Sequence, residues 1–220
     1  MTVKEQIKEI KAQFRLAMNG AVSHSMRKRG LNYKLNFGIE LPRIKMIAAK
    51  YEPNHELAQE LWKEEIRESK ILATLLQPID SFFPEIADIW VLRIDTIEIA
   101  EIACMNLFQK LPYAQTKSFQ WIASDQEYVQ TCGFLTLARL LVHTNLDNQS
   151  ENEFIDQAIT AACSDEYHVR NAALLAMKKY INKGRREATL LLKDVEKYSD
   201  SSKEHEQNLY RLVQNEIQYL

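Results

Sequence analysis

The chain has 220 residues, a length that suits one domain or one extended array with a sizeable core. Apolar residues make up 46% and charged residues 26%, values that exclude an intrinsically disordered chain. The net charge of −2 excludes a polycation, and the 5 glycines and 5 prolines are too few for the turns of an all-β fold. The composition therefore favours long helices joined by short turns.

The first 50 residues are predicted to form helices that carry a basic surface. Thr2 and Glu5 make a capping box, and apolar residues follow at helical spacing until a predicted end at Gly20. A second, basic helix is predicted to stop at Gly30, because glycine suits a left-handed cap. The stretch 32–38 is predicted to be irregular.

Ten further helices are predicted, each with an apolar stripe on one face. They span residues 54–61, 63–76, 84–92, 95–109, 113–123, 126–143, 151–163, 166–181, 186–198 and 202–219. The branched residues Ile66, Ile99, Val129 and Val169 hold equivalent places, at intervals of 33, 30 and 40 residues. Periods of this size indicate a helical solenoid, in which each helix pair buries its apolar face by stacking on the next.

The predicted fold is therefore all-α: a HEAT-like repeat α-solenoid (α-α superhelix) of stacked antiparallel helix pairs. We expect one domain over residues 1–220, with basic N-terminal helices at 1–50 and the repeat array at 51–220. The stretch 164–173 is the best local match to a HEAT repeat. There we expect Asp165 to cap a helix and Arg170 to tie neighbouring repeats together.

Charge is distributed unevenly along the chain. Residues 25–50 contain seven basic side chains and one acidic one, residues 80–101 six acidic and one basic, and residues 178–197 seven basic and three acidic. Two basic ends around an acidic middle are informative about partners rather than about the fold.

Three motifs resemble the HEAT-like alkylpurine DNA glycosylases of bacteria, the AlkD-like DNA alkylation repair family. They are Phe37-Gly38-Ile39-Glu40-Leu41-Pro42-Arg43, then Glu60-Leu61-Trp62 followed by Arg67-Glu68, and Trp121-Ile122-Ala123-Ser124-Asp125. Their order and spacing agree with the family over roughly residues 30–200. The resemblance implies a solenoid with a basic concave face that holds duplex DNA, and the excision of cationic alkylated purines without a metal or cofactor.

The resemblance also implies site residues. The family's chemistry uses an Asp carboxylate facing the deoxyribose, where positive charge develops, together with tryptophans against the sugar and an Arg near the phosphate. Asp95 matches the catalytic Asp, and Trp90 matches the first Trp. Val91, Thr131 and Leu175 stand where the family has a second Trp, the Arg and a further Trp. Whether this chain is an enzyme therefore stays open.

Two of these residues also have structural interpretations. Asp95 is well placed to be the N-cap of the helix that follows it. Trp90 shares an apolar stripe with Ile86 and Ile89, which indicates a core residue as well as a platform for DNA.

Basic side chains at the two ends of the chain are candidates for contacts with DNA phosphates. The candidates are Arg27, Lys28, Arg29, Lys34, Arg43 and Lys45 near the N-terminus, and Lys179, Arg185 and Arg186 near the C-terminus. The N-terminal group is interleaved with Tyr33 and Phe37. A solvated surface is the alternative for these charges.

No metal or cofactor is expected, because no His or Cys pair has metal-ligand spacing. Cys104, Cys132 and Cys163 are expected to be buried thiols in a reducing compartment. The polar first residues and the lack of an apolar run of about 20 residues favour a cytoplasmic protein without a membrane span.

Two functions remain open at this stage. The first is a duplex-DNA-binding member of the glycosylase family with reduced or lost base excision. The alternative is a non-enzymatic HEAT-like scaffold that binds a protein or peptide partner, which the acidic middle and the net charge favour.

Overall fold

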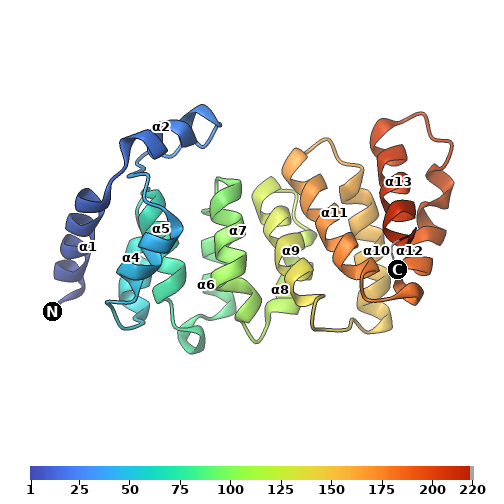
Figure 1. Cartoon of the computed structure of the whole chain (residues 1–220). Coiled ribbons are helices and arrows are strands. Elements are labelled where there is room, and N and C mark those ends of the chain that lie inside the picture. Colours follow the sequence, from blue (N-terminus) through green and yellow to red (C-terminus); the bar gives the residue numbers. More distant parts are fainter. Residues whose placement is uncertain (219–220) are drawn as a thin grey trace. The chain divides into compact units, whose positions relative to one another are not determined.

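The computed structural model describes residues 1–218, which divide into two compact units at Leu111 and Pro112. A single domain over residues 1–220 stays a prediction. Figure 1 shows that both units consist of helices packed side by side. Within the described residues the only β-type pairing is an isolated parallel bridge between Leu35 and Ile66.

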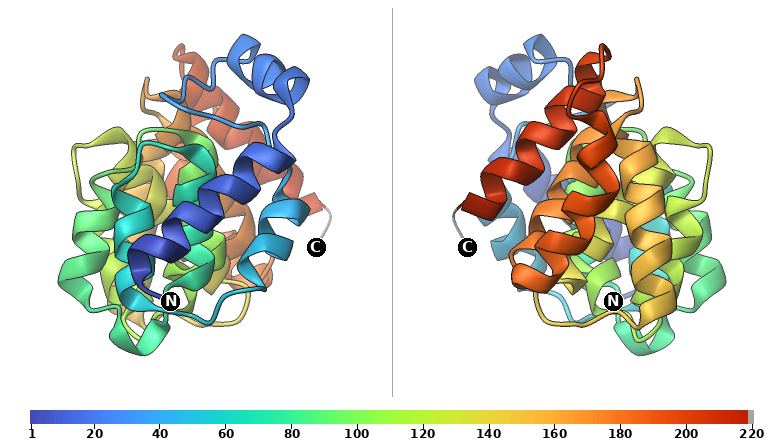
Figure 2. Two further views of the ribbon diagram at one scale, coloured as in Figure 1. Left: turned by 90° about the vertical axis from the view of Figure 1, so that its left-hand side faces the viewer. Right: turned by 90° about the vertical axis from the view of Figure 1, so that its right-hand side faces the viewer.

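The N-terminal unit consists of seven α-helices and two short 3₁₀ helices within the described chain. They are α1 (Val3–Ala17), α2 (Gly20–Lys28), α3 (Leu41–Ala48), α4 (His55–Lys63), α5 (Arg67–Leu76), η1 (Ile79–Ser81), α6 (Pro84–Val91), α7 (Ile97–Asn106) and η2 (Phe108–Lys110). The pair α4/α5 packs through α5 against α7, and α1 packs on α4. Figure 2 shows α1 crossing obliquely over this pair, while α2 stands out at one end of it.

Local sequence explains how the first helices begin and end. The predicted capping box is confirmed, since Thr2 accepts from the Glu5 N–H and the Glu5 carboxylate accepts from the Thr2 N–H. The expectation that Gly20 ends the first helix is wrong. The chain leaves α1 at Met18, and Asn19 caps a new helix in which Gly20 is the first residue. Gly30, with φ of 87°, confirms the left-handed end of α2.

The stretch between α2 and α3 is irregular, as predicted. We call residues 31–40 the strap. Gly38 in the strap has a φ of 69°, and a Cβ there would lie 2.2 Å from the backbone oxygen of Asn19. Glycine is therefore required by both the backbone conformation and the close approach to the start of α2.

The C-terminal unit contains three helix pairs within the described residues. Their members are α8 (Ala114–Ile122), α9 (Glu127–Leu140), α10 (Asn148–Ala162), α11 (Tyr167–Ile181), α12 (Arg185–Val195) and α13 (Glu204–Gln218), with η3 (Glu196–Tyr198) after α12. The second helices α9 and α11 pack against each other. A Cβ on Gly133 would lie 2.6 Å from the Ile122 backbone nitrogen, so this glycine lets α9 approach α8 closely.

The predicted helices are all present, and the errors lie at their ends. The helix predicted over 63–76 begins at Arg67, because residues 64–66 are extended and Ile66 pairs with Leu35. The helix predicted from 151 begins at Asn148, since Asp147 caps it by accepting from the Ser150 N–H at 2.8 Å. Residue 219, the last of the helix predicted over 202–219, lies outside the described residues.

Candidate functional site

A pocket of about 510 Å³ opens on the N-terminal unit, where the end of α4, the start of α5 and the turn between α6 and α7 meet. It is lined by Trp62, Lys63, Glu65, Lys70, Leu92, Arg93, Ile94 and Asp95. Three cations and two carboxylates therefore surround a small apolar floor. The pocket contains the residue that the sequence singled out as catalytic.

Asp95 lies at the mouth of this pocket. Its side chain is 74% exposed, and one carboxylate oxygen lies 3.7 Å from Lys70 Nζ. The expectation that Asp95 caps the following helix is wrong, because Thr96 is the N-cap of α7 and accepts from the Ile99 N–H. The carboxylate of Asp95 is thus available to a ligand.

Two stacked tryptophans lie behind the pocket. The rings of Trp62 and Trp90 are parallel within 4° and their centroids are 4.2 Å apart. Trp90 is fully buried, and its Nε1 donates to Gln59 at 2.9 Å. In this arrangement the Trp90 ring belongs to the core, as does Trp62, and neither ring presents a free face to a ligand. Ile89, which the predicted stripe placed beside Trp90, is exposed instead.

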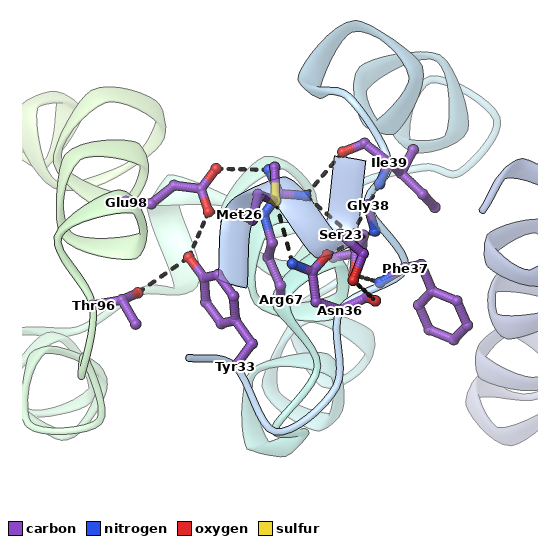
Figure 3. Close-up of polar contacts among 11 residues, drawn as sticks. Ser23, Met26, Tyr33, Asn36, Phe37, Gly38, Ile39, Arg67, Thr96 and Glu98 are labelled. Carbon is purple, nitrogen blue, oxygen red and sulfur yellow. Dashed lines mark hydrogen bonds and ion pairs between the residues drawn. The ribbon is translucent and has the colours of Figure 1, made fainter. Parts of the chain in front are cut away.

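A buried ionic network holds the α5 and α7 sides of this region together (Figure 3). Arg67 donates from Nε to Glu98 Oε2 at 2.8 Å and from Nη2 to Glu98 Oε1 at 2.6 Å. The Tyr33 hydroxyl donates to the same carboxylate, and Thr96 donates to Tyr33. Burial works to raise the pKa of Glu98, but the hydrogen bonds from Arg67 and Tyr33 outweigh it and lower the pKa.

The strap is tied to this network through Glu68, which is fully buried. Its two carboxylate oxygens accept from the backbone N–H groups of Phe37 and Ile39 at 3.1 and 3.2 Å. Arg67 completes the link by donating to the Ile39 carbonyl at 2.8 Å. Burial and the hydrogen bond to Glu98 raise the pKa of Tyr33, so this phenol stays protonated. Tyr33 and Phe37, expected near DNA, are thus engaged in packing, with Phe37 against Phe14.

The basic residues predicted near the N-terminus are all exposed, but they do not form one cluster. Arg27, Lys28 and Arg29 follow one another on and directly after α2. Lys34 in the strap forms an ion pair of 2.7 Å with Glu65 at the pocket. Arg43 and Lys45 lie on α3, and no contact in the described residues joins them to the pocket. Only Lys34 of these residues therefore reaches the pocket through a contact.

The C-terminal basic candidates differ in whether carboxylates hold their side chains. Lys179 is exposed and lines a pocket of about 410 Å³ at the ends of α9 and α11. Arg185 is exposed at the start of α12. Arg186 is held by Glu151, through Nη1 at 2.9 Å and Nη2 at 2.6 Å, and also by Glu187. These ion pairs lower the pKa of Glu151 and give Arg186 a structural role inside its unit.

A family model described as "DNA alkylation repair enzyme" matches residues 10–157, about two thirds of the chain. The chain belongs to the DNA alkylation repair family. Among solved structures, one described as "A new family of proteins related to the HEAT-like repeat DNA glycosylases with affinity for branched DNA structures" has a TM-score of 0.75 and 18% sequence identity. The match covers 100% of this chain and 95% of the other. No curated protein matches.

The likeness confirms the predicted all-α, HEAT-like repeat fold for this member of the DNA alkylation repair family. Val91 and Thr131, which the sequence resemblance aligned with a Trp and the Arg of the family, are buried inside their own units. Leu175, in place of a further Trp, is 40% exposed on α11.

The HEAT-repeat motif in the C-terminal unit works differently from the prediction. Asp165 is exposed and does not cap α11, whose N-cap is Glu166. Arg170 donates to the carbonyls of Ser164 and Asp165, at 2.6 and 3.2 Å. The arginine thus holds the turn of its own repeat.

Sequence reasoning missed Lys70, which lines the pocket, and the Arg67–Glu98 pair, which joins α5 to α7 beside it. Arg67 and Glu68 appeared only as part of a family motif, and Lys70 stands in an unremarkable run of polar and apolar residues. In α5 as described, residues 67–74 are all buried. Ion pairs over distances of 31 positions leave no periodic signal in one sequence.

The remaining expectations concern thiols, metals and membranes. Cys104 and Cys132 are buried, as expected, and Cys163 is half-buried. Across residues 1–218, no group of three or more His, Cys, Asp or Glu side chains is placed to hold a metal ion. In the same part of the chain, no helix is both long enough and apolar enough to cross a membrane.

Proposed function

We propose that this chain is a DNA-binding protein in which base excision is reduced or lost. The observation that carries the proposal is the set of unpaired cations on α2. Within residues 1–218, Arg27 and Lys28 form no ion pair, and Arg29 makes a hydrogen bond only to the Ser25 carbonyl. The Glu98 carboxylate attracts Arg29 over a longer distance, but no carboxylate of the described residues forms an ion pair with any of the three cations. Neighbouring cations of this kind are suited to phosphates, whose neutralisation releases counterions.

The proposed loss of excision rests on the family positions. The buried Val91 and Thr131 supply neither a stacking ring nor a phosphate contact. Asp95 remains exposed, but the Lys70 ammonium at 3.7 Å offsets its negative charge. A carboxylate that is partly neutralised stabilises an oxocarbenium-like transition state less well.

The form of DNA is the finer part of the proposal. The structurally similar protein is described as having affinity for branched DNA structures. For this chain the expected partner is duplex DNA, and a branched duplex adds phosphates that an exposed basic helix such as α2 can reach. Contacts of the exposed C-terminal cations Lys179 and Arg185 with DNA phosphates remain part of the proposal, as does a cytoplasmic location.

The test is a binding titration with a labelled 20-base-pair duplex and a four-way junction, across a salt series. The variant carries Arg27→Gln, Lys28→Gln and Arg29→Gln. It is expected to weaken binding by about 10- to 100-fold and to reduce the slope of log affinity against log salt by about 2 to 3. The matched control changes three exposed cations on α1, Lys4→Gln, Lys8→Gln and Arg15→Gln. If both triple variants weaken binding equally, the effect comes from net charge alone and the α2 cations are not a specific DNA contact.

The second candidate is a scaffold for a protein or peptide. It is favoured by exposed apolar side chains on and beside α6, namely Phe83, Ile89 and Leu92, which are 59%, 55% and 55% exposed. Aromatic and aliphatic side chains exposed together are typical of protein interfaces. If the wild-type chain binds both DNA forms no more tightly than about 10⁻⁴ M at physiological salt, this candidate replaces the first.

A further inference from the structure

The pocket beside Asp95 contains a cation that is buried but poorly satisfied. Lys70 is 7% exposed, and its Nζ makes one hydrogen bond, to the Arg93 carbonyl at 2.8 Å. Asp95 at 3.7 Å attracts it without forming a hydrogen bond. An ammonium has three N–H donors, and a buried charge is stable when its donors are used. The ammonium also lies over the Trp62 ring, 5.7 Å from the ring centroid. Neither this ring nor Asp95 accepts a conventional hydrogen bond from Lys70, so N–H donors are left for a ligand that accepts them.

A second cation of the pocket is free. Arg93 is exposed and, among residues 1–218, forms no ion pair. The other charges around the pocket are already matched, since Lys34 pairs with Glu65 and Lys63 with Glu60. The Glu65 carboxylate also attracts Lys70 and Arg93 over a longer distance, but its contact is with Lys34. Within the described residues Arg93 therefore contacts no carboxylate, and Lys70 has only Asp95 at 3.7 Å. An acceptor with negative charge fits this set better than a cation or a neutral group.

We propose that Lys70 and Arg93 form an anion site that takes one backbone phosphate of DNA. The inference rests on the proposed function, and it adds a specific contact to it. A phosphodiester oxygen can accept from the free donors of Lys70 and from the Arg93 fork, which suits phosphate geometry. Asp95 then faces outward beside the bound phosphate, and its distance from Lys70 allows this without breaking a hydrogen bond. A free phosphate shares the same chemistry and is distinguished by the test.

Trp62 provides the reporter for this test. It lines the pocket, and its indole N–H has no hydrogen-bond partner within the described residues, so its resonance responds to nearby charge. The chain has three tryptophans. Trp121 lies in the C-terminal unit and serves as the internal reference. A Trp62→Phe variant assigns the resonance.

The experiment titrates the ¹⁵N-labelled full chain with a dinucleotide, which contains one phosphodiester and no terminal phosphate, and separately with inorganic phosphate. We expect a saturable shift of the Trp62 resonance with the dinucleotide. Lys70→Met and Arg93→Gln should each weaken that binding by about 10-fold. Arg15→Gln, an exposed arginine on α1, should leave it unchanged. Lys70→Arg keeps the charge and should retain binding, which separates charge from folding.

The outcomes separate this inference from the proposed function. If inorganic phosphate alone gives the shift, the site takes a free anion and the assignment to DNA is overturned. If neither probe gives a saturable shift, or if Arg93→Gln binds the dinucleotide like the wild type, the anion site is overturned. In either case the triple variant on α2 still decides whether the chain binds DNA. On duplex DNA, Arg93→Gln should reduce the salt slope by about 1.

Discussion

Arg67 and Glu98 form a two-point ion pair, with donor–acceptor distances of 2.8 and 2.6 Å, that joins α5 to α7 across 31 sequence positions. Arg67 is 1% exposed, so its charge depends on this carboxylate and on the neighbouring Glu68. The pair also positions Tyr33 and, through it, the strap that precedes α3.

Removal of the Glu98 carboxylate should destabilise the protein strongly. Glu98→Ala leaves the buried Arg67 guanidinium without its main partner, and breaking such a pair lowers the free energy of unfolding by about 3 kcal/mol. Chemical denaturation followed by circular dichroism measures the change. Glu101→Gln, at an exposed position of the same helix, should change stability by less than about 0.5 kcal/mol. If both variants lose a similar free energy of unfolding, the buried ion pair contributes no more to stability than an exposed carboxylate does.

The same carboxylate should make stability depend on pH in the acid range. The folded-state pKa of Glu98 lies below its ordinary value of 4.5. Its contribution is therefore complete above about 4.5 and is lost as pH falls through the lower, folded-state pKa. We expect the Glu98→Gln variant to lose less stability than the wild type between pH 5 and about 3. Parallel curves for the two proteins would contradict this assignment.

The fold could be predicted because the sequence signals that specify it lie within each helix or recur at a fixed spacing. Each helix has an apolar stripe, and Ile66, Ile99, Val129 and Val169 mark the repeat without reference to contacts. Helix ends were less predictable where the deciding partner is distant. The turn at residues 64–66 exists because Ile66 pairs with Leu35, and nothing in the local sequence of that turn indicates this pairing.

Close packing of α8 against α9 should be sensitive to a single methyl group. A Cβ on Gly133 would lie 2.6 Å from Ile122 N and 2.8 Å from Ser118 O, both backbone atoms that cannot rotate away. Gly133→Ala should therefore lower the free energy of unfolding by about 1–3 kcal/mol despite the better helix propensity of alanine. Gly20→Ala is the matched control, since nothing lies within 4 Å of that position. It should be neutral or slightly stabilising, and a loss equal to that of Gly133→Ala would refute the packing argument.

The candidate site was predictable only in part. Asp95 was found through a short motif, and the structure places it at a pocket mouth. Trp90 came from the same motif, and it is buried, as the core interpretation of its apolar stripe predicted. Lys70 was not found at all, since its significance depends on the Arg93 carbonyl and on burial by other helices.

Substitution of Asp95 should change DNA affinity little, but it should abolish any base excision that the chain retains. We expect the wild-type chain to release alkylated purines from methylated duplex DNA at a rate near the uncatalysed background. The reason is that Val91 and Thr131, which the sequence resemblance aligned with a Trp and the Arg of the family, are buried and cannot contact DNA. Asp95→Asn removes a charge that Lys70 already offsets, so duplex affinity should change by less than about 3-fold. Single-turnover release assays at matched DNA saturation measure base release by both proteins.

If the wild type releases bases well above background, and Asp95→Asn does so at the same rate, then Asp95 is not the catalytic carboxylate. Release that falls by about 10-fold or more in Asp95→Asn would instead establish retained chemistry at this pocket.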